Sequence, residues 1–252
     1  MEALAWEKEI DRQMETKEFT TDTIRDIRIL QSKRGYRFSV DALLLYHFVD
    51  LPRCRRIADI GAGSGIISIL LAKKYPDAKL SAIEIQKVLY ELALRNIHEN
   101  GLQKQIEVLQ RDIKAYRKIF KPGTFDLAVS NPPFRRPLSG LVSPEAERAI
   151  ARHEIKITLS DLIKAASYLL KVRGRFDIIY HPSRLTELIT TMKRHDLEPK
   201  RLRSVHSKPG DEAKMILLEA VKSGRTELRV EQPLYIYNED GSYSPEMVEI
   251  YG

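Results

Sequence analysis

Cysteine and long apolar runs are almost absent from this sequence. The only cysteine is Cys54, which excludes an internal disulfide and a metal site built on cysteine ligands. No apolar run approaches the length of a membrane span, and the first 22 residues are too charged to contain the apolar core of a signal peptide. We therefore expect a soluble, cytoplasmic protein without a membrane partner or a bound metal. The composition leaves its oligomeric state unknown.

Acidic residues are also in the minority. Lys and Arg together number 42 and Asp and Glu number 35, so the formal net charge is +7. Such a surplus favours a polyanionic partner. Basic residues are concentrated at Lys33, Arg34 and Arg37, at Arg135 and Arg136, at Arg148 and Arg152, and at Lys200, Arg201 and Arg203. These clusters indicate contacts with a nucleic acid, unless they are the solvated faces of ordinary helices and loops.

A strand, a glycine turn and a helix follow one another in the first third of the chain. The apolar run 56–60 predicts a buried strand, Gly61, Gly63 and Gly65 make the turn, and a helix is predicted over 66–74. In this arrangement the glycines let backbone N–H groups approach a ligand at the helix N-terminus. Asp59 precedes the turn, where a carboxylate would repel a pyrophosphate but suits the amino group of an amino-acid-bearing cofactor. The pattern therefore favours S-adenosylmethionine over NAD.

Two further predicted strands lead into acidic residues. The strand over 79–83 is followed by Glu84, about 20 residues beyond the glycines, where an acid that binds ribose hydroxyls is expected. The strand over 105–109 leads to Asp112 and Ile113, which could accept the adenine amine of the cofactor and pack against its ring. The alternatives are a solvated strand-end acid at position 84 and a helix N-cap at position 112.

The fourth predicted strand, 125–129, is followed by Ser130 and by Asn131, Pro132, Pro133 and Phe134. The Asn131 side-chain oxygen can accept one N–H of an exocyclic amine, and the Pro132 carbonyl can accept the other. The prolines fix the backbone at low entropic cost, and the Phe134 ring offers a flat face on which a base can stack. We interpret this segment as a clamp that frees the lone pair of the amine. The alternative is a strand that ends in a Pro-rich turn.

The rest of the chain completes an α/β pattern. We expect a hairpin from 24–31 and 36–38 around a turn at Lys33 to Gly35, helices over 42–48, 88–100, 113–120, 159–170 and 182–195, and strands over 175–180, 201–206 and 214–220. Ser39 is a predicted N-cap and Asp41 a first-turn acid that complements the helix dipole. Gly101 and Gly174 are expected to end the helices that precede them.

The segment 135–157 is long and has no strong periodicity. Loops of this length usually carry function or are disordered. It contains Arg148, Arg152, His153 and Glu154, which could hold phosphate or shape the pocket.

At these motifs the sequence resembles the class I S-adenosylmethionine-dependent methyltransferases. Residues 59–65 resemble their first motif, and Asn131 to Phe134 resemble their amino-methyltransferase motif. Within that class, residues 35–41 and the segment Arg152, His153 and Glu154 look like the bacterial tRNA1(Val) adenine-37 N6-methyltransferase family. The likeness covers roughly residues 24 to 222.

The resemblance implies an α/β fold and a division of the chain. The fold is a Rossmann-like sheet of seven strands, mostly parallel with the last strand antiparallel, and with helices on both faces. The implied parts are an N-terminal arm over 1–23, a methyltransferase domain with an N-terminal hairpin over 24–222, and a C-terminal extension over 223–252.

The resemblance also implies a site and an activity, which is methyl transfer to N6 of an adenine in tRNA. For the cofactor it implies that Asp59, Gly61, Gly63 and Gly65 hold the methionine portion, that Glu84 binds ribose, that Asp112 and Ile113 bind adenine, and that Asp41 closes over the ligand. For the substrate it implies that Asn131, Pro132, Pro133 and Phe134 hold the target base and that Arg135, Arg136, Arg152 and His153 contact the RNA.

Other functions use related features. Guanine N2 methylation of ribosomal RNA and glutamine N5 methylation of release factors use the same fold, although the glutamine enzymes carry a larger helical N-terminal domain than this chain supplies. A non-catalytic RNA-binding protein could retain the sheet. Cytosine C5 methylation would need a thiol, and Cys54 lies before the first strand of the domain, in a poor position for it. An NAD-linked oxidoreductase is disfavoured because no group for hydride transfer is visible.

Overall fold

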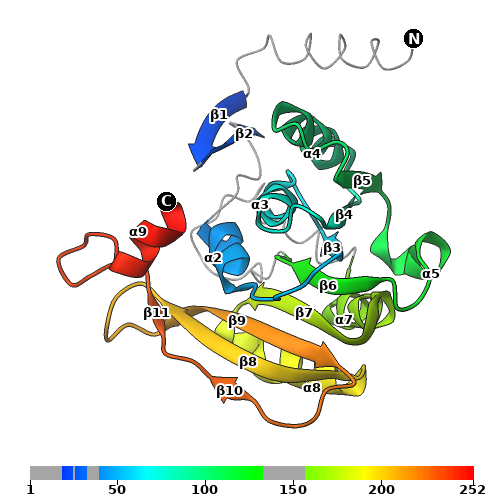
Figure 1. Ribbon diagram of the computed structural model, residues 1–252. Coiled ribbons are helices and arrows are strands. Elements are labelled where there is room, and N and C mark those ends of the chain that lie inside the picture. Colours follow the sequence, from blue (N-terminus) through cyan, green and yellow to red (C-terminus); the bar gives the residue numbers. More distant parts are fainter. Residues whose placement is uncertain (1–18, 25, 33–39, 133–156) are drawn as a thin grey trace, which may run out of the picture.

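The computed structural model describes residues 19–24, 26–32, 40–132 and 157–252. These residues form one large mixed sheet with helices on both faces, together with a separate two-stranded hairpin (Figure 1). The strands of the large sheet are β3 (Arg56–Ile60), β4 (Lys79–Glu84), β5 (Ile106–Gln110), β6 (Phe125–Ser130), β7 (Leu170–Tyr180), β8 (Leu197–His206), β9 (Ala213–Lys222), β10 (Arg229–Val230) and β11 (Leu234–Tyr235). Their order is β10-β8-β9-β7-β6-β3-β4-β5, and β11 also pairs with β8.

The seven strands predicted from the sequence are all present in this sheet. β3 pairs in parallel with β4 and β6, and the same direction continues to β5 and β7. β9 is antiparallel to both β7 and β8. The predicted Rossmann-like sheet, mostly parallel with its last strand antiparallel, is therefore confirmed. β10 and β11 are short additions that run parallel to β8.

Helices cover both faces of the sheet and enclose two apolar cores. One face carries α2 (Val40–Phe48), α3 (Ile66–Lys74), α4 (Lys87–Glu99) and α9 (Pro245–Tyr251), and the other carries α5 (Tyr116–Ile119), α7 (Leu159–Leu169) and α8 (Leu185–Arg194) (Figure 1). Burial on both sides explains why the central strands are almost continuously apolar.

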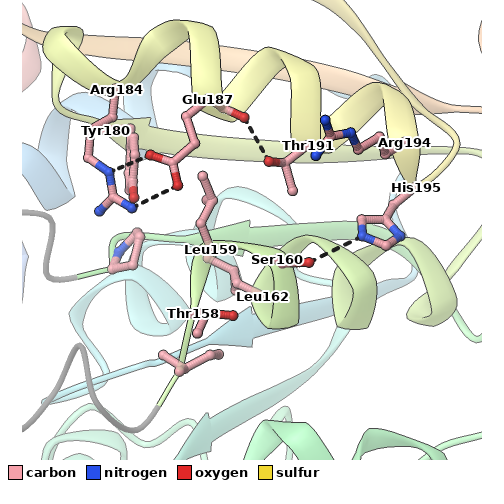
Figure 2. Close-up of a pocket in the computed structure, with 12 residues that line it drawn as sticks. Thr158, Leu159, Ser160, Leu162, Tyr180, Arg184, Glu187, Thr191, Arg194 and His195 are labelled. Atoms are coloured by element: carbon pink, nitrogen blue, oxygen red, sulfur yellow. Dashed lines mark hydrogen bonds and ion pairs between the residues drawn. The ribbon is translucent and has the colours of Figure 1, made fainter.

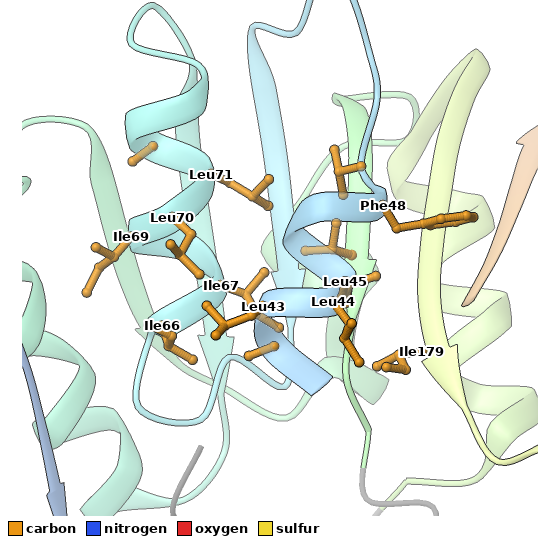
Figure 3. Close-up of a cluster of buried hydrophobic side chains, with 14 of the residues drawn as sticks. Leu43, Leu44, Leu45, Phe48, Ile66, Ile67, Ile69, Leu70, Leu71 and Ile179 are labelled. Atoms are coloured by element: carbon orange, nitrogen blue, oxygen red, sulfur yellow. The ribbon is translucent and has the colours of Figure 1, made fainter. Parts of the chain in front are cut away.

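The helix α3 is enclosed by its neighbours. Each residue from Ile66 to Ala72 is buried, and the α2 side chains Leu43 and Leu44 belong to the same apolar cluster (Figure 3). A helix that is apolar all round is stable only when it is surrounded by protein. α3 therefore gives a rigid support to the glycine turn that immediately precedes it.

The N-terminal hairpin differs from the prediction. It consists of β1 (Phe19–Ile24) and β2 (Ile27–Ser32), which pair antiparallel with Ile24 opposite Ile27. The chain therefore reverses between these two residues, inside the stretch 24–31 that is expected from the sequence to be a single extended strand. The expected turn at Lys33 to Gly35 and the return over 36–38 lie outside the described residues. Both strands contain β-branched residues, for example Thr21 opposite Leu30 and Ile29 opposite Asp22, and such residues favour strands on both sides of the reversal.

Gly174 does not end a helix, contrary to the prediction. α7 ends at Leu169, and Gly174 lies inside β7 next to an irregularity in the pairing of β6 with β7. A Cβ atom built on Gly174 would lie 2.9 Å from the carbonyl oxygen of Lys171, so this glycine permits a close backbone approach. Gly101, by contrast, follows α4 with φ of +69°, as predicted.

The predicted helices over 113–120 and 182–195 both begin as 3-10 turns, at Ile113–Ala115 and Pro182–Arg184. Within the described ranges, no helix is long and apolar enough to cross a membrane. A group of three or more His, Cys, Asp or Glu side chains arranged to hold a metal ion is likewise not found among these residues.

The C-terminal residues fold back onto the domain. α9 packs against α2, with Met247 and Ile250 fully buried. The Arg203 guanidinium donates two hydrogen bonds to the Glu246 carboxylate, of 2.5 and 2.7 Å, and Nε2 of His47 lies 3.4 Å from the same carboxylate. Arg201 likewise pairs with Glu219 and lies over the Phe48 ring. Arg201 and Arg203 therefore hold the fold together and are not simply solvated cations.

Candidate active site

The predicted site residues at the ends of β6, β3, β4 and β5 lie at one edge of the sheet. In the order β6-β3-β4-β5, Asn131, Gly61 and Glu84 occur at or directly after the carboxyl ends of the first three strands, and Asp112 follows β5. These strands are parallel, so their carboxyl ends meet at the same edge, which is where open α/β sheets bind ligands. The fold thus brings together residues that are up to 70 positions apart in the sequence (Asn131 and Gly61).

The glycine turn is held in a conformation that needs glycine. Gly61, Gly63 and Gly65 have φ of +78°, +57° and +84°, in the left-handed region. The N–H groups of Gly61 and Ala62 donate to the carbonyl oxygen of Ile83, at 2.9 and 3.0 Å, so the turn is fastened to the end of β4. A Cβ atom on Gly65 would lie 3.3 Å from the Cβ of Ala93, which makes the approach of α4 close as well.

The Glu84 carboxylate supports the glycine turn. Its side chain is buried, Oε2 accepts a hydrogen bond of 3.0 Å from the N–H of Gly63, and Oε1 accepts one of 2.8 Å from the N–H of Gln86. It is therefore not a solvated strand-end acid. Each carboxylate oxygen can accept a second hydrogen bond, so the group keeps capacity for a ligand hydroxyl.

Asp59 is fully buried beneath the same turn. Its Oδ2 accepts a hydrogen bond of 2.7 Å from the Ser68 hydroxyl, whereas Oδ1 and the buried hydroxyl of Ser64 have no hydrogen-bond partner among the described residues. Burial, opposed by the Ser68 hydrogen bond and reinforced by the charge of Glu84, raises the pKa of Asp59 to about 7. Two unsatisfied buried polar atoms, one near the end of β3 and one in the glycine turn, are the features expected of a binding site.

Asp112 caps the 3-10 turn after β5. Its Oδ1 accepts a hydrogen bond of 2.9 Å from the N–H of Lys114, which is the N-cap alternative considered above, and Ile113 is buried. The second carboxylate oxygen lies 3.6 Å from Nζ of Lys114, and the Asp112 side chain as a whole is partly exposed. Capping and ligand binding are compatible because the oxygens are separate. A role toward adenine stays a prediction.

Asn131 follows the buried end of β6. The hydroxyl of Ser130 donates a hydrogen bond of 2.7 Å to the carbonyl oxygen of Ile60, the last residue of β3. This bond ties the residue before Asn131 to the residue before Gly61. Asn131 and Pro132 are partly buried. The structure therefore places the start of the predicted clamp beside the glycine turn.

Several predicted residues fall outside the described ranges. These are Pro133 and Phe134 of the clamp and the predicted RNA contacts Arg135, Arg136, Arg152 and His153. Asp41 is described and lies, partly buried, in the first turn of α2. Its role toward a ligand stays a prediction.

Sequence reasoning missed Asn96, a fully buried residue of α4. Its Nδ2 donates to the carbonyl oxygens of Ser64, at 2.9 Å, and Leu30, at 3.2 Å, and its Oδ1 accepts from the N–H of Leu30 at 2.8 Å. Asn100 makes the same pair of bonds with Arg28, at 2.7 and 3.1 Å. The signal in the sequence was two asparagines four residues apart, which lie on one face of a helix.

Comparison with known proteins matches most of the chain to methyltransferases. The sequence pattern of the methyltransferase small domain family matches residues 39–193. The chain is 30% identical over 195 residues to the tRNA1(Val) (adenine(37)-N6)-methyltransferase of Bacteroides thetaiotaomicron, covering 77% of this chain and 80% of that protein. It is 34% identical over 196 residues to the protein of the same name from Porphyromonas gingivalis strain ATCC 33277, covering 76% of each.

Solved structures share the fold. The crystal structure of a predicted O-methyltransferase from Agrobacterium tumefaciens superimposes with a TM-score of 0.68 at 24% sequence identity, covering 84% of this chain and 95% of the other. TYW2 of P. horikoshii in complex with MeSAdo superimposes with a TM-score of 0.58 at 17% identity, covering 83% and 73% of the two chains. At these identities the likeness shows the architecture alone.

Proposed function

The chain belongs to the methyltransferase small domain family, and from this premise we propose that it transfers a methyl group from S-adenosylmethionine to N6 of an adenine in tRNA, at position 37 of tRNA1(Val). The relatives named tRNA1(Val) (adenine(37)-N6)-methyltransferase support the choice of this adenine as the methyl acceptor. The arrangement of the sheet edge supports the choice of chemistry.

The residues around the glycine turn fit S-adenosylmethionine. Among the described residues, Oδ1 of Asp59 and the hydroxyl of Ser64 are buried without hydrogen-bond partners, so the end of β3 and the glycine turn offer an acceptor and a hydroxyl to an amino-acid group. Glu84 retains acceptor capacity for the ribose hydroxyls, and Asp112 lies one strand further along for the adenine. The bound cofactor supplies a methyl group activated by a sulfonium. In our proposal Asp41 closes over it.

The chain itself orients the acceptor and exposes its lone pair. The Asn131 side-chain oxygen accepts a hydrogen bond from one N–H of the adenine amine, and the Pro132 carbonyl accepts one from the other N–H, so the lone pair is drawn out of conjugation with the ring. When the nitrogen gains the methyl group, it releases one of these two protons to solvent. The sequence adds Pro133 to fix the backbone and Phe134 as a stacking surface. Positioning supplies most of the catalysis, and no covalent intermediate is required.

The observation that carries the proposal is the hydrogen bond from Ser130 to Ile60. It joins the strand that leads into the amine clamp to the strand that leads into the glycine turn, because β3 and β6 are neighbours. In our proposal a nucleophile held by Asn131 therefore lies next to the loop that holds the methyl donor.

The cost of presenting a base and the charge of the protein also favour an unpaired adenine in RNA as the substrate. An anticodon-loop adenine is already unpaired, so presenting it to the clamp costs less than extracting a base from a duplex. We propose that Arg135, Arg136, Arg152 and His153 contact the RNA and that the enzyme works in the cytoplasm. The net charge of +7 favours such a polyanion.

Transfer of labelled methyl to total tRNA from a strain that lacks this protein tests the function. Purified protein and labelled S-adenosylmethionine are incubated with that tRNA, and the modified nucleoside is identified by mass spectrometry. We expect N6-methyladenosine at position 37 of tRNA1(Val). Label in N2-methylguanosine, or no label in any adenosine of this tRNA, would contradict the proposal, and tRNA from the parent strain, already modified, is the matched control.

A further inference from the structure

A cavity of about 480 Å³ lies between α7 and α8 (Figure 2). Pro132 is one of the residues that line it. Pro132 follows Asn131 directly, so their Cα atoms are separated by about 3.8 Å. The volume lies within the range of about 300–1,000 Å³ that is usual for ligand sites. The cavity therefore adjoins the proposed amine clamp and has room for a further part of the substrate.

The wall of the cavity is apolar on the α7 side. Leu159 and Leu162 are buried in the helix and contribute to the lining (Figure 2). Ser160 of the same helix and Thr191 of α8 add hydroxyl groups. An apolar surface with a few polar groups is the lining that suits a flat heterocycle with hydrogen-bonding edges.

The charges of the cavity are separated. At one end the Arg184 guanidinium donates to both carboxylate oxygens of Glu187, at 2.9 and 3.1 Å, so these charges compensate each other. At the other end lie Arg194 and His195, the latter 3.4 Å from the Ser160 hydroxyl (Figure 2). Arg194 is exposed and forms no ion pair with any residue that the structure describes. This end offers an uncompensated cation to an anionic group.

We propose that this cavity binds the nucleotide next to the target adenine in the same RNA strand. Its base lies against Leu159 and Leu162, and its phosphate is held by Arg194. The inference rests on the proposed function, because it takes RNA as the substrate. A nucleotide satisfies both halves of the lining at once, with a planar base for the apolar side and a phosphate for the cationic end.

The test uses the full-length protein and stem-loop RNAs of the anticodon arm. One RNA is intact, and two others have an abasic residue on the 5′ or the 3′ side of the target adenine. Ser160→Phe fills the cavity from α7, and Arg194→Gln removes the cation. Lys193→Gln is the matched control, since it removes the same charge from the adjacent residue of α8, which does not line the cavity.

We expect wild-type kcat/KM to fall at least tenfold on one abasic RNA. For Ser160→Phe, kcat/KM on the intact RNA should be at least tenfold below that of the wild type, and it should fall little further on that abasic RNA. The cofactor affinity and the thermal unfolding of this variant should be unchanged. The association constant for the RNA should fall less steeply with salt concentration in Arg194→Gln. The slope of its logarithm against the logarithm of the salt concentration should be smaller by about 0.7, the value for one phosphate contact on a single strand, whereas Lys193→Gln should leave the slope unchanged.

Wild-type activity on the abasic RNAs equal to that on the intact RNA would overturn the inference. The inference would also be overturned if Ser160→Phe lowered kcat/KM by the same factor on all three RNAs. It would equally be overturned if RNA binding by Arg194→Gln and by Lys193→Gln had the same dependence on salt concentration. The proposed function fails differently, because the wild-type protein would then methylate none of these RNAs.

Discussion

The Asn96 side chain donates one hydrogen bond to the glycine turn, at the carbonyl oxygen of Ser64, and another to the N-terminal hairpin, at the carbonyl oxygen of Leu30. Asn96 is fully buried, so neither contact can be replaced by bulk water. The position of the proposed cofactor loop is thus linked to that of β2 through one residue of α4.

Replacement of Asn96 should weaken cofactor binding more than replacement of Asn100. Asn96→Ala leaves the Ser64 carbonyl and the Leu30 backbone without these partners, and each unsatisfied buried group costs about 1–3 kcal/mol. Asn100→Ala loosens the hairpin at Arg28 but does not touch the turn. Calorimetry should show a dissociation constant for S-adenosylmethionine at least tenfold higher in the first variant and within about twofold of wild type in the second. Equal affinities in the two variants would refute the link.

Asp59 should make stability depend on pH in a predictable direction. Its pKa is about 7 in the folded protein against 3.8 for the free side chain, so the folded state holds a proton that the unfolded state has lost over this interval. Stability from this group is therefore lost as pH rises from about 4 to about 7. Asp59→Asn removes the dependence, and its stability relative to wild type should increase by about 4 kcal/mol between pH 4 and pH 8. Urea unfolding at both pH values measures this, and a constant difference would contradict it.

Glu84→Gln should affect binding of the cofactor and not the chemical step. The neutral amide keeps one oxygen but places an NH2 group where one of the backbone N–H groups of Gly63 and Gln86 now donates. We expect at least a tenfold rise in the dissociation constant of S-adenosylmethionine, with kcat at saturating cofactor within about threefold of wild type. Glu107→Gln is the control, an exposed acid on the neighbouring strand β5. A change in kcat without a change in affinity would exclude the proposed role.

The elements that sequence reasoning located well are those fixed by local chemistry. The helix α3 has the predicted bounds, because a glycine turn and an uninterrupted apolar run determine both its start and its environment. The position of the site at one edge of the sheet could also be predicted, because parallel strands that alternate with helices bring their carboxyl ends together.

Features set by contacts between distant segments could not be predicted in this way. The hairpin reverses between Ile24 and Ile27, where no glycine marks a turn, and its position is held by Asn96 and Asn100 more than 60 residues away (a separation of 66 for Leu30 and Asn96). Gly174 has the sequence context of a residue that ends a helix. In the structure it lies in a strand, where the absence of a side chain allows the backbone of Lys171 to approach closely. The cavity between α7 and α8 combines residues around 160 with residues around 190, and no sequence motif spans both.

The most direct test is the single-turnover rate of methyl transfer by Asn131→Ala to unmodified tRNA1(Val) at saturating S-adenosylmethionine. Loss of one group that interacts with the reacting atoms typically costs about 10²–10³ in rate. We predict a fall of at least 100-fold, with N6-methyladenosine as the only product and with unchanged affinity for S-adenosylmethionine. A transfer rate equal to that of the wild-type protein would contradict the account.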